Sequence, residues 1–401
     1  MLHGFFLSKY IKLKLNYEFY KFQRFFLLSE QIGTTIRNLQ TPVLLIDLDV
    51  MEKNLQKMAS FFVDSSINLR PHSKTHKSPL IANTQIEMGA VGICCQKVSE
   101  AEVMYQGGID NILISSEIIS PAKLERVSSL SKNCDLMLVV DHVQGAELLS
   151  KIMKKNGTEI GVLVDIDVGQ GRCGVRTVDE AVSLAIKIDE LPSINLRGFQ
   201  AYNGKAQHIE GFNQREKEYE NSIVMMQESV YAFEKNGLNI DIRSGGGTGT
   251  WNWDLDSNIL NEVQAGSYLF MDSHYGSIGG KQGELYEDFQ ASLFVLSTIV
   301  SFPEDKKFII DAGHKSLSSD SGFASCYDYQ EATYISASDE HGIISMDSLS
   351  VLPKLGDPLL FQPSHCDTTI NLFDCFYGIR GGMDNGLLET VLPISARGMV
   401  Q

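Results

Sequence analysis

Residues 135–167 read DLMLVVDHVQGAELLSKIMKKNGTEIGVLVDID, and they establish the fold class. Two apolar runs of strand length, Asp135–Val140 and Gly161–Asp167, flank an amphipathic stretch, Val143–Lys154. Apolar residues that recur every three or four positions predict a helix, whereas short runs of branched apolar residues predict buried strands. A strand, a helix and a second strand in this order are typical of a βαβ unit with parallel strands.

The same alternation continues in both directions along the chain. Counting from Val43 gives eight strand-like runs, each followed by a helix or a turn, within about 230 residues. Eight such units predict a closed (β/α)8 barrel of the α/β class, and a doubly wound open sheet is the alternative. The runs are Val43–Asp47, Asn68–Arg70, Val91–Cys95, Asn111–Ile114, Asp135–Val140, Gly161–Asp167, Leu196–Ala201 and Asn239–Ile242.

The pattern changes after about Tyr275, where alternating apolar and polar residues replace helical periodicity. Short runs such as Ala291–Val300 and Pro358–Gln362, separated by Gly and Asp turns, predict a mostly β domain. The sequence therefore predicts three parts: a basic N-terminal extension and lead-in at 1–40, the barrel at 41–275, and the β domain at 276–401. Since no linker of low complexity separates the last two, we expect them to pack closely.

Composition excludes several classes of function. The chain has 401 residues and a net charge of -16, of which residues 1–28 contribute +4 and the rest -20. The basic segment suggests a dispensable extension, a targeting segment or an amphipathic membrane-surface helix. An acidic body argues against nucleic acid as a partner, and no apolar run is long enough to cross a membrane. Seven cysteines without a CxxC motif predict a reducing, cytoplasmic location.

A basic, imidazole-rich segment, Arg70–Lys77 (RPHSKTHK), follows the second strand-like run. Residues two apart share a face of an extended chain, so His72 and His76 would flank Lys74. Neighbouring cations and partial burial lower the pKa of a lysine, which is what a Schiff-base lysine needs. A basic surface turn is the alternative interpretation.

Two turns of small residues are candidates for binding an anion. Ser244–Thr250 (SGGGTGT) follows the eighth strand-like run, and Gln264–Tyr268 (QAGSY) lies shortly after it. Glycine amides can converge on a phosphate, and barrels commonly bind phosphate in the loops after the last two strands. A flexible turn is the alternative, and the absence of a GxxxxGK[ST] motif argues against a P-loop.

Arg172 lies between glycines in the segment 167–174, DVGQGRCG. Its guanidinium is a permanent donor that could face a pyridine nitrogen, unless it pairs with Asp165 or Asp167. His208 titrates near neutral pH and is a candidate general base, although a lone histidine is more often structural.

His365 and Asp367 lie two residues apart in the β domain, with Cys366 between them. In an extended segment the two side chains would share one face. An imidazole and a carboxylate are ligands for a divalent ion, and the oxygen donor favours Mn or Mg over a thiolate zinc site. A surface histidine beside an aspartate turn is the alternative.

Taken together, these segments resemble the D-threonine aldolase and D-serine dehydratase-like family. That family comprises fold-type III pyridoxal-phosphate enzymes related to the N-terminal barrel of alanine racemase. The resemblance extends from about Thr41 to the C-terminus. Its most specific segments are Arg70–Lys77 and His365–Thr369. The matching segments are Arg70–Lys77, Gly171–Val175, Gly245–Thr250, Glu262–Asp272, Asp311–Lys315, Glu340–Gly342 and His365–Thr369.

The resemblance implies a role for each candidate residue. Lys74 matches the lysine that binds pyridoxal phosphate covalently, and Arg172 matches the residue that faces the pyridine nitrogen. His208 matches a histidine near the substrate hydroxyl. The other implied positions are Tyr202 beside the cofactor, Gly246, Gly247, Thr248, Gly266 and Ser267 at the phosphate, and His365 and Asp367 at the metal.

The residues 365–369, HCDTT, resemble the aldolase branch, which has His-Cys-Asp-Pro-Thr, more than the dehydratase branch, which has His-x-Cys and zinc. Thr368 replaces the usual proline, which would have stiffened the turn. Asn203 and Lys205 also depart from the family pattern. A lysine at the rim of the pocket would favour an acidic substrate.

The aldolase branch implies retro-aldol cleavage of a D-β-hydroxy amino acid with pyridoxal phosphate and a divalent metal, Mn or Mg. The substrate would be D-threonine, giving glycine and acetaldehyde, or D-3-hydroxyaspartate, giving glycine and glyoxylate. The alternative reaction is β-elimination of D-serine or D-threo-3-hydroxyaspartate. A non-catalytic pyridoxal-phosphate-binding protein is the alternative of another class, and the second domain argues against it. A homodimer is implied by the resemblance alone.

Overall fold

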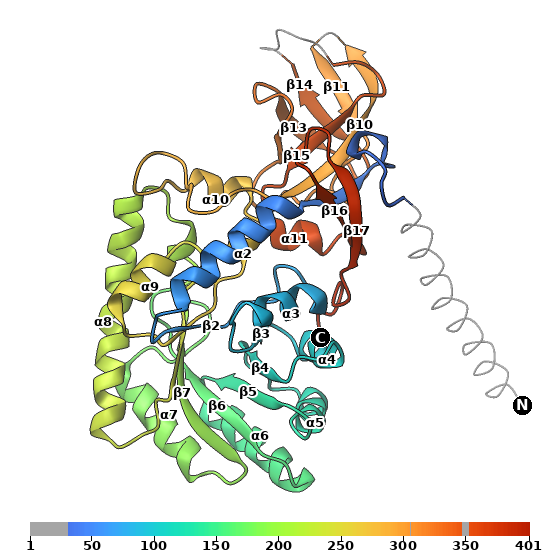
Figure 1. The fold of residues 1–401 in the computed structure, drawn as a ribbon. Helices are drawn as coiled ribbons and strands as arrows, with labels where there is room; N and C mark the ends of the chain where they lie inside the picture. Colours follow the sequence, from blue (N-terminus) through green and yellow to red (C-terminus); the bar gives the residue numbers. More distant parts are fainter. Residues whose placement is uncertain (1–30, 305, 347–352) are drawn as a thin grey trace, which may run out of the picture.

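The computed structural model describes residues 31–304, 306–346 and 353–401. Two sheets organise these residues: a parallel sheet surrounded by helices, and a mostly antiparallel sheet that lies beyond one end of it (Figure 1). The predicted basic extension, residues 1–28, lies outside the described residues.

The parallel sheet has eight strands in the order β2-β9-β8-β7-β6-β5-β4-β3. Backbone hydrogen bonds join its first and last strands: the Val91 amide donates to the Leu69 carbonyl at 3.0 Å, and the Cys94 amide donates to the Pro71 carbonyl at 2.9 Å. The predicted barrel is therefore confirmed. Its strands are β2 (Asn68–Leu69), β3 (Ile93–Cys95), β4 (Asn111–Ile114), β5 (Asp135–Val140), β6 (Ile160–Asp165), β7 (Ile194–Ala201), β8 (Ile242–Gly245) and β9 (Glu262–Val263).

One strand lies elsewhere than expected. β1 (Val43–Asp47), which the sequence pattern counts as the first barrel strand, pairs with β10 (Leu293–Glu304) and β16 (Cys375–Arg380) of the other sheet. The eighth barrel strand is instead β9, which has only two residues. All five residues of β1 are buried, so its apolar run is compatible with either sheet. The range 41–275 thus includes one strand that is not part of the barrel.

Local signals explain where the helices begin and end. The Thr177 hydroxyl accepts from the Glu180 amide in a capping box at the start of α7, and Gly157 takes a left-handed conformation at the end of α6. Among the described residues, no helix is both long and apolar enough to cross a membrane. The α-helices up to the second sheet are α2 (Leu48–Phe62), α3 (Pro79–Glu87), α4 (Val98–Gln106), α5 (Pro121–Leu130), α6 (Val143–Asn156), α7 (Val178–Glu190), α8 (Phe212–Lys235), α9 (Trp251–Ser257) and α10 (Ser273–Ser277). The short 3-10 helices are η1 (Ile36–Asn38), η2 (Ala206–His208) and η3 (Ser267–Leu269).

The second sheet confirms the predicted mostly β domain. Its main order is β13-β14-β11-β10-β1-β16-β17, with β15 paired to β10 and β12 paired to β15. One short helix, α11 (Cys366–Ile370), follows β15. The remaining strands are β11 (Lys307–Ile310), β12 (Ser325–Cys326), β13 (Thr333–Ala337), β14 (Gly342–Ser345), β15 (Pro358–Gln362) and β17 (Leu387–Pro393).

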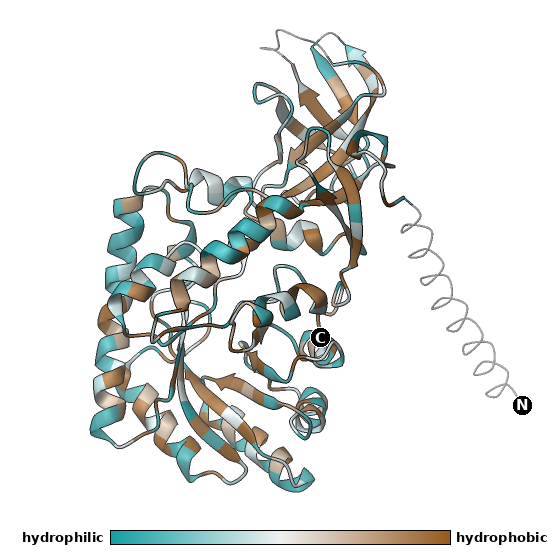
Figure 2. Ribbon diagram, viewed as in Figure 1, coloured by the Kyte–Doolittle hydropathy of each residue, from teal (hydrophilic) through white to brown (hydrophobic). Residues whose placement is uncertain are grey.

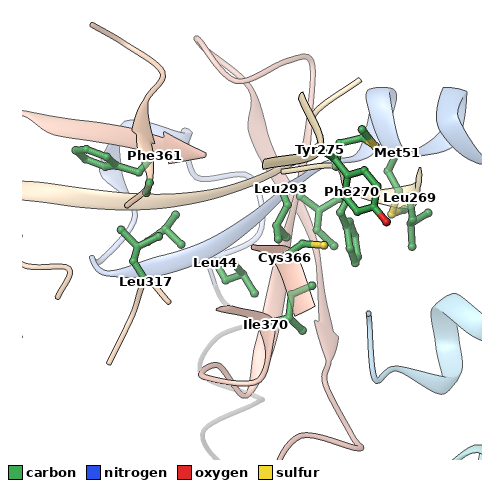
Figure 3. Close-up of a cluster of buried hydrophobic side chains, with 14 of the residues drawn as sticks. Leu44, Met51, Leu269, Phe270, Tyr275, Leu293, Leu317, Phe361, Cys366 and Ile370 are labelled. Atoms are coloured by element: carbon green, nitrogen blue, oxygen red, sulfur yellow. The ribbon is translucent and has the colours of Figure 1, made fainter. Parts of the chain in front are cut away.

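The two sheets share a hydrophobic core, which agrees with the expectation that the two domains pack closely. Apolar residues follow the strands of both sheets, while the outer faces of the helices are hydrophilic (Figure 2). Figure 3 shows Phe270 and Tyr275 of the segment after β9 beside Leu293, Cys366 and Ile370 of the β domain, all within one buried cluster. Burial of this shared apolar surface holds the β domain over the mouth of the barrel.

Candidate active site

A pocket lies where the C-terminal ends of the barrel strands meet the β domain. The pocket is partly open to solvent. Nearly every residue predicted for the site lines this pocket. The predicted residues in its wall are Lys74, Arg172, Tyr202, His208, Gly247, Thr248, Gly266, Ser267, His365 and Asp367.

The electrostatic environment of Lys74 differs from the expectation. The Asp367 carboxylate lies 3.3 Å from the lysine Nζ and raises the pKa of Lys74, whereas the sequence pattern predicted a lowered pKa. Burial lowers the pKa of His72 to about 3 and the pKa of His76 to about 4. Both imidazoles are therefore neutral at neutral pH, so neither is the neighbouring cation that the sequence pattern predicted.

The turn that carries Lys74 is held by its own side chains and by the strands beside it. The Lys74 amide donates to His72 Nδ1 at 3.3 Å, and the other ring nitrogen of His72 lies 2.9 Å from the Ser115 hydroxyl. The Ser73 amide donates to the Cys94 carbonyl at 2.8 Å. Lys74 therefore lies where the first and last strands of the barrel, β2 and β3, meet.

A cup of small residues faces the same pocket. A Cβ on Gly247 would lie 2.6 Å from Gln207 Oε1, and a Cβ on Gly266 would lie 2.7 Å from Thr75 Oγ1, so neither position has room for a side chain. The amides of Thr248, Gly266 and Ser267 make no hydrogen bond within the described residues. Unpaired amides of this kind fit a phosphate group.

Gly246 is the one predicted site residue that does not line the pocket. Its φ is +63°, and a Cβ there would lie 2.2 Å from the buried carboxylate of Asp254. Only glycine takes this conformation without steric cost, so Gly246 shapes the turn that presents Gly247 and Thr248.

Arg172 lies on an exposed loop with its guanidinium 6.0 Å from the centre of the Tyr202 ring. The alternative pairing with an aspartate does not occur among the described residues. Asp167 instead accepts from the Gly171 amide at 2.9 Å, and Asp165 accepts from Gln200 at 2.8 Å. The guanidinium therefore remains available to the pocket that it lines.

His208 ends η2 and lies in an aromatic stack. Its ring centre is 4.6 Å from that of His274 and 4.4 Å from that of Tyr275. Burial, followed by the charges of His274, His365 and Lys74, lowers the pKa of His208 to about 4. His208 Nδ1 is buried and has no partner within the described residues. The imidazole is thus neutral and has a free nitrogen.

His274 and Tyr275 were not predicted, although Tyr275 lines the pocket. The sequence signal for them is weak: they follow shortly after the small-residue turn Gln264–Tyr268. Asp272 holds them in place, because its Oδ1 accepts from the Tyr275 amide at 2.9 Å. Its Oδ2 accepts from the Cys366 amide at 2.9 Å. This buried carboxylate joins the barrel side of the pocket to the β-domain side.

His365 and Asp367 come together as predicted, but through a different local structure. The segment is not extended throughout, because α11 begins at Cys366 with His365 as its N-cap. The Cys366 side chain is buried in the shared core (Figure 3) and does not line the pocket. The described residues contain no group of three or more metal-type ligands. One imidazole and one carboxylate nevertheless fit a hard divalent ion whose other ligands are water and substrate.

The charge of Asp367 supports this fit. Burial acts to raise the pKa of Asp367, but the charges of Lys74 and His365 outweigh it and hold the pKa well below its usual range. The carboxylate is therefore ionised, as a metal ligand must be.

Three residues depart from the family pattern, and the structure places each of them in a different environment. Lys205 does not line the pocket and lies 3.6 Å from Glu218 in an exposed ion pair, so the expected pocket-rim cation is absent. Asn203 is buried and donates to Ser222 at 3.0 Å. Thr368 occupies the first turn of α11 and donates its hydroxyl to Asp320 at 2.8 Å.

Arg215, near the start of α8, was also missed because nothing local distinguishes it from a surface arginine. Its guanidinium is buried and donates to four backbone carbonyls, those of Gly249, Ile209, Ile278 and Gly279, at 2.6–3.1 Å. One side chain thus links the glycine loop, the residue after His208 and the end of α10.

The barrel, the lysine at its mouth and the glycine cup define a pyridoxal-phosphate enzyme of the barrel type. The chain belongs to the alanine racemase N-terminal domain family, which residues 46–274 match, and residues 292–379 match a serine dehydratase domain. This confirms the family to which the sequence motifs point.

Relatives of this chain include both reaction types. A 3-hydroxy-D-aspartate aldolase of Paracoccus denitrificans is 40% identical over 91% of this chain and 94% of its own length. The crystal structure of a D-threonine aldolase from Filomicrobium marinum is 38% identical and superposes with a TM-score of 0.89, covering 92% of this chain and 99% of that chain. A D-threo-3-hydroxyaspartate dehydratase of Delftia is more distant, at 30% identity over 72% of this chain and 76% of its own length.

Proposed function

We propose that this protein is a pyridoxal-phosphate- and divalent-metal-dependent aldolase that cleaves the Cα–Cβ bond of a D-β-hydroxy amino acid. The products are glycine and an aldehyde. One observation carries the proposal: the amine of Lys74 and the ligand pair His365 and Asp367 line a single pocket. A cofactor-binding lysine beside a site for a hard ion is the arrangement that a metal-assisted retro-aldol reaction requires.

The residues of the cup would bind and orient the cofactor. The free amides of Thr248, Gly266 and Ser267 would hold the phosphate, and Lys74 would bind the aldehyde carbon. Arg172 would face the ring nitrogen, where a guanidinium has no proton to give up at neutral pH. Tyr202 would lie beside the ring.

His208 would take the proton of the β-hydroxyl. Its imidazole is neutral, since burial and nearby cations lower its pKa to about 4, and its unpaired Nδ1 can accept. His365 and Asp367 would hold the ion next to that hydroxyl. When bound, the cofactor delocalises the electron pair left on Cα and the ion polarises the hydroxyl.

Asp367 has a single cation, Lys74, within ion-pair distance among the described residues. When the lysine is committed to the cofactor, its ammonium no longer neutralises this partly buried carboxylate. A divalent ion would replace that charge, which gives a physical reason for the two groups to occupy the same pocket.

The dehydratase reaction is the second candidate, and Cys366 bears on it. Its thiol is fully buried in the shared core, and burial raises the pKa of Cys366 well above its usual value. The residue that reaches the pocket is the carboxylate of Asp367. An oxygen ligand favours a hard ion such as Mn or Mg, so the donor set supports the aldolase.

A product assay tests the proposed function. Purified protein loaded with pyridoxal phosphate is incubated with D-threonine, D-3-hydroxyaspartate and D-serine, each with Mn²⁺, Mg²⁺, Zn²⁺ or a chelator. We expect glycine and acetaldehyde or glyoxylate in equal amounts, with no turnover in chelator. Ammonia and a keto acid without glycine would establish a dehydratase instead.

We also propose that the protein is a cytoplasmic homodimer. Six cysteines are free thiols, which agrees with a reducing compartment: Cys94, Cys95, Cys134, Cys173, Cys326 and Cys366. The dimer rests on the family resemblance, and light scattering coupled to gel filtration would measure the mass directly.

A further inference from the structure

A loop of the β domain that does not line the pocket contacts the His365 ring. In that loop, between β11 and β12, Asp320 Oδ2 lies 2.6 Å from His365 Nδ1. The other oxygen of Asp320 accepts from the Thr368 hydroxyl at 2.8 Å and from the Ser318 hydroxyl at 2.6 Å. Three side chains thus converge on one carboxylate.

These bonds fix which nitrogen of His365 faces the pocket. An ionised carboxylate can only accept, so Nδ1 carries the proton, and in the neutral ring Nε2 keeps its lone pair. The ring is then held in the orientation that presents Nε2 to a ligand. Carboxylates that bind the second nitrogen of a metal-bound histidine in this way are common in metal sites.

The position of Asp320 is set by the same helix that bears the ligands. Thr368 lies in the first turn of α11, one residue after Asp367. The Ser318 amide donates to Thr369 Oγ1 at 3.2 Å, and the Ser364 hydroxyl donates to the Ser318 carbonyl at 3.2 Å. The loop and the helix therefore form one hydrogen-bonded unit.

We propose that Asp320 is a positioning residue for the divalent ion, oriented by Thr368 and Ser318, and that it presents His365 Nε2 to the metal. The inference rests on the proposed function, because it requires the metal site of His365 and Asp367. Asp320 does not line the pocket, so its effect is on metal affinity and not on the chemical step.

The test measures the affinity of the cofactor-loaded protein for Mn²⁺ without substrate, from the electron paramagnetic resonance signal of free Mn²⁺. We expect Asp320→Ala to weaken binding by about 10- to 100-fold. Thr368→Val, which removes only the hydroxyl, should weaken it by about 3- to 10-fold. Thr368→Ser should restore the affinity, and Asp339→Ala, at an exposed position of the same domain, should leave it unchanged.

A second measurement separates positioning from a structural role. At saturating Mn²⁺, the kcat of Asp320→Ala should return to within a few-fold of the wild type. If kcat stays low at every Mn²⁺ concentration, or if Asp320→Ala and the wild type bind Mn²⁺ with equal affinity, the inference is wrong. If the wild type itself does not bind Mn²⁺, the metal site of the proposed function has failed, which is a different result.

Discussion

His208 is neutral because of what surrounds it. Its ring stacks on His274 and Tyr275, and burial together with nearby positive charge lowers its pKa to about 4. A histidine with this pKa is unprotonated throughout the physiological range, so its ring has a lone pair available to accept a proton.

We predict that His208→Gln lowers kcat by about 100- to 10,000-fold, the usual contribution of a general base. Glutamine approximates the size of the ring but does not accept and hold a proton. Steady-state kinetics with the best substrate of the product assay measures the change. The exposed His341→Gln serves as the control, and an unchanged kcat in His208→Gln would assign the proton transfer to another group.

Gly266 is constrained by space and not by backbone conformation. Its φ of -125° is open to any residue, but a Cβ would lie 2.7 Å from Thr75 Oγ1 and 2.9 Å from the His72 carbonyl. Gly266 of the cup therefore fits closely against the turn that bears Lys74.

Gly266→Ala should weaken pyridoxal-phosphate binding by at least about tenfold, because the added methyl group forces this turn away from the cup. Gly276→Ala is the matched control, since a Cβ there meets nothing within 4 Å. Equilibrium titration of the apoprotein followed by absorbance gives both affinities. Equal affinities would show that the cup does not contact the phosphate at this point.

At the scale of elements, α8 contributes the clamp that joins three loops of the site. Arg215 is 1% exposed and donates to four carbonyls, and the rings of Phe212, Trp253 and Tyr286 lie within 6 Å of its guanidinium. The planar fork of arginine is needed to reach carbonyls in several directions.

Arg215→Lys should lower the free energy of unfolding by about 2–4 kcal/mol, because an ammonium group cannot pair all four buried carbonyls. Cofactor affinity should fall as well, since Gly249 belongs to the glycine loop. Urea unfolding and cofactor titration provide the two measurements. Arg176→Lys, on an exposed loop of the same barrel, should change neither quantity, and a stable Arg215→Lys with normal affinity would contradict the clamp.

At the scale of the whole molecule, the site exists only because the β domain packs on the barrel. The barrel supplies Lys74, the cup and His208, whereas α11 of the β domain supplies the ligand pair. Asp272 fixes this assembly by accepting one backbone amide from each side of the pocket.

Asp272→Ala should therefore reduce activity more than it reduces cofactor affinity. The two amides lose a buried acceptor, at a cost of about 2–4 kcal/mol in stability, and α11 can shift relative to His208. We expect a raised Mn²⁺ requirement and a lower kcat, measured beside the exposed control Asp241→Ala. Normal kinetics in a destabilised Asp272→Ala would mean that the carboxylate serves folding alone.

Much of the fold and the site follows from local sequence patterns. Apolar runs and amphipathic stretches locate seven of the eight barrel strands, β2 to β8. Short glycine turns and the segments Arg70–Lys77 and His365–Thr369 mark the site. These features are local because they depend on residues that are neighbours in the sequence. They are the periodicity of helices and strands, the steric freedom of glycine and the chemistry of the ligand side chains.

The tertiary structure decided what depends on contacts between distant residues. The apolar run Val43–Asp47 could be buried in either sheet. Only its pairing with β10 and β16 shows that it is not a barrel strand. The pKa of Lys74 is raised because folding brings Asp367 to 3.3 Å across almost 300 positions of sequence. Charge, burial and strand membership depend on spatial neighbours, so the sequence supplies the groups of this site and the fold determines how each of them behaves.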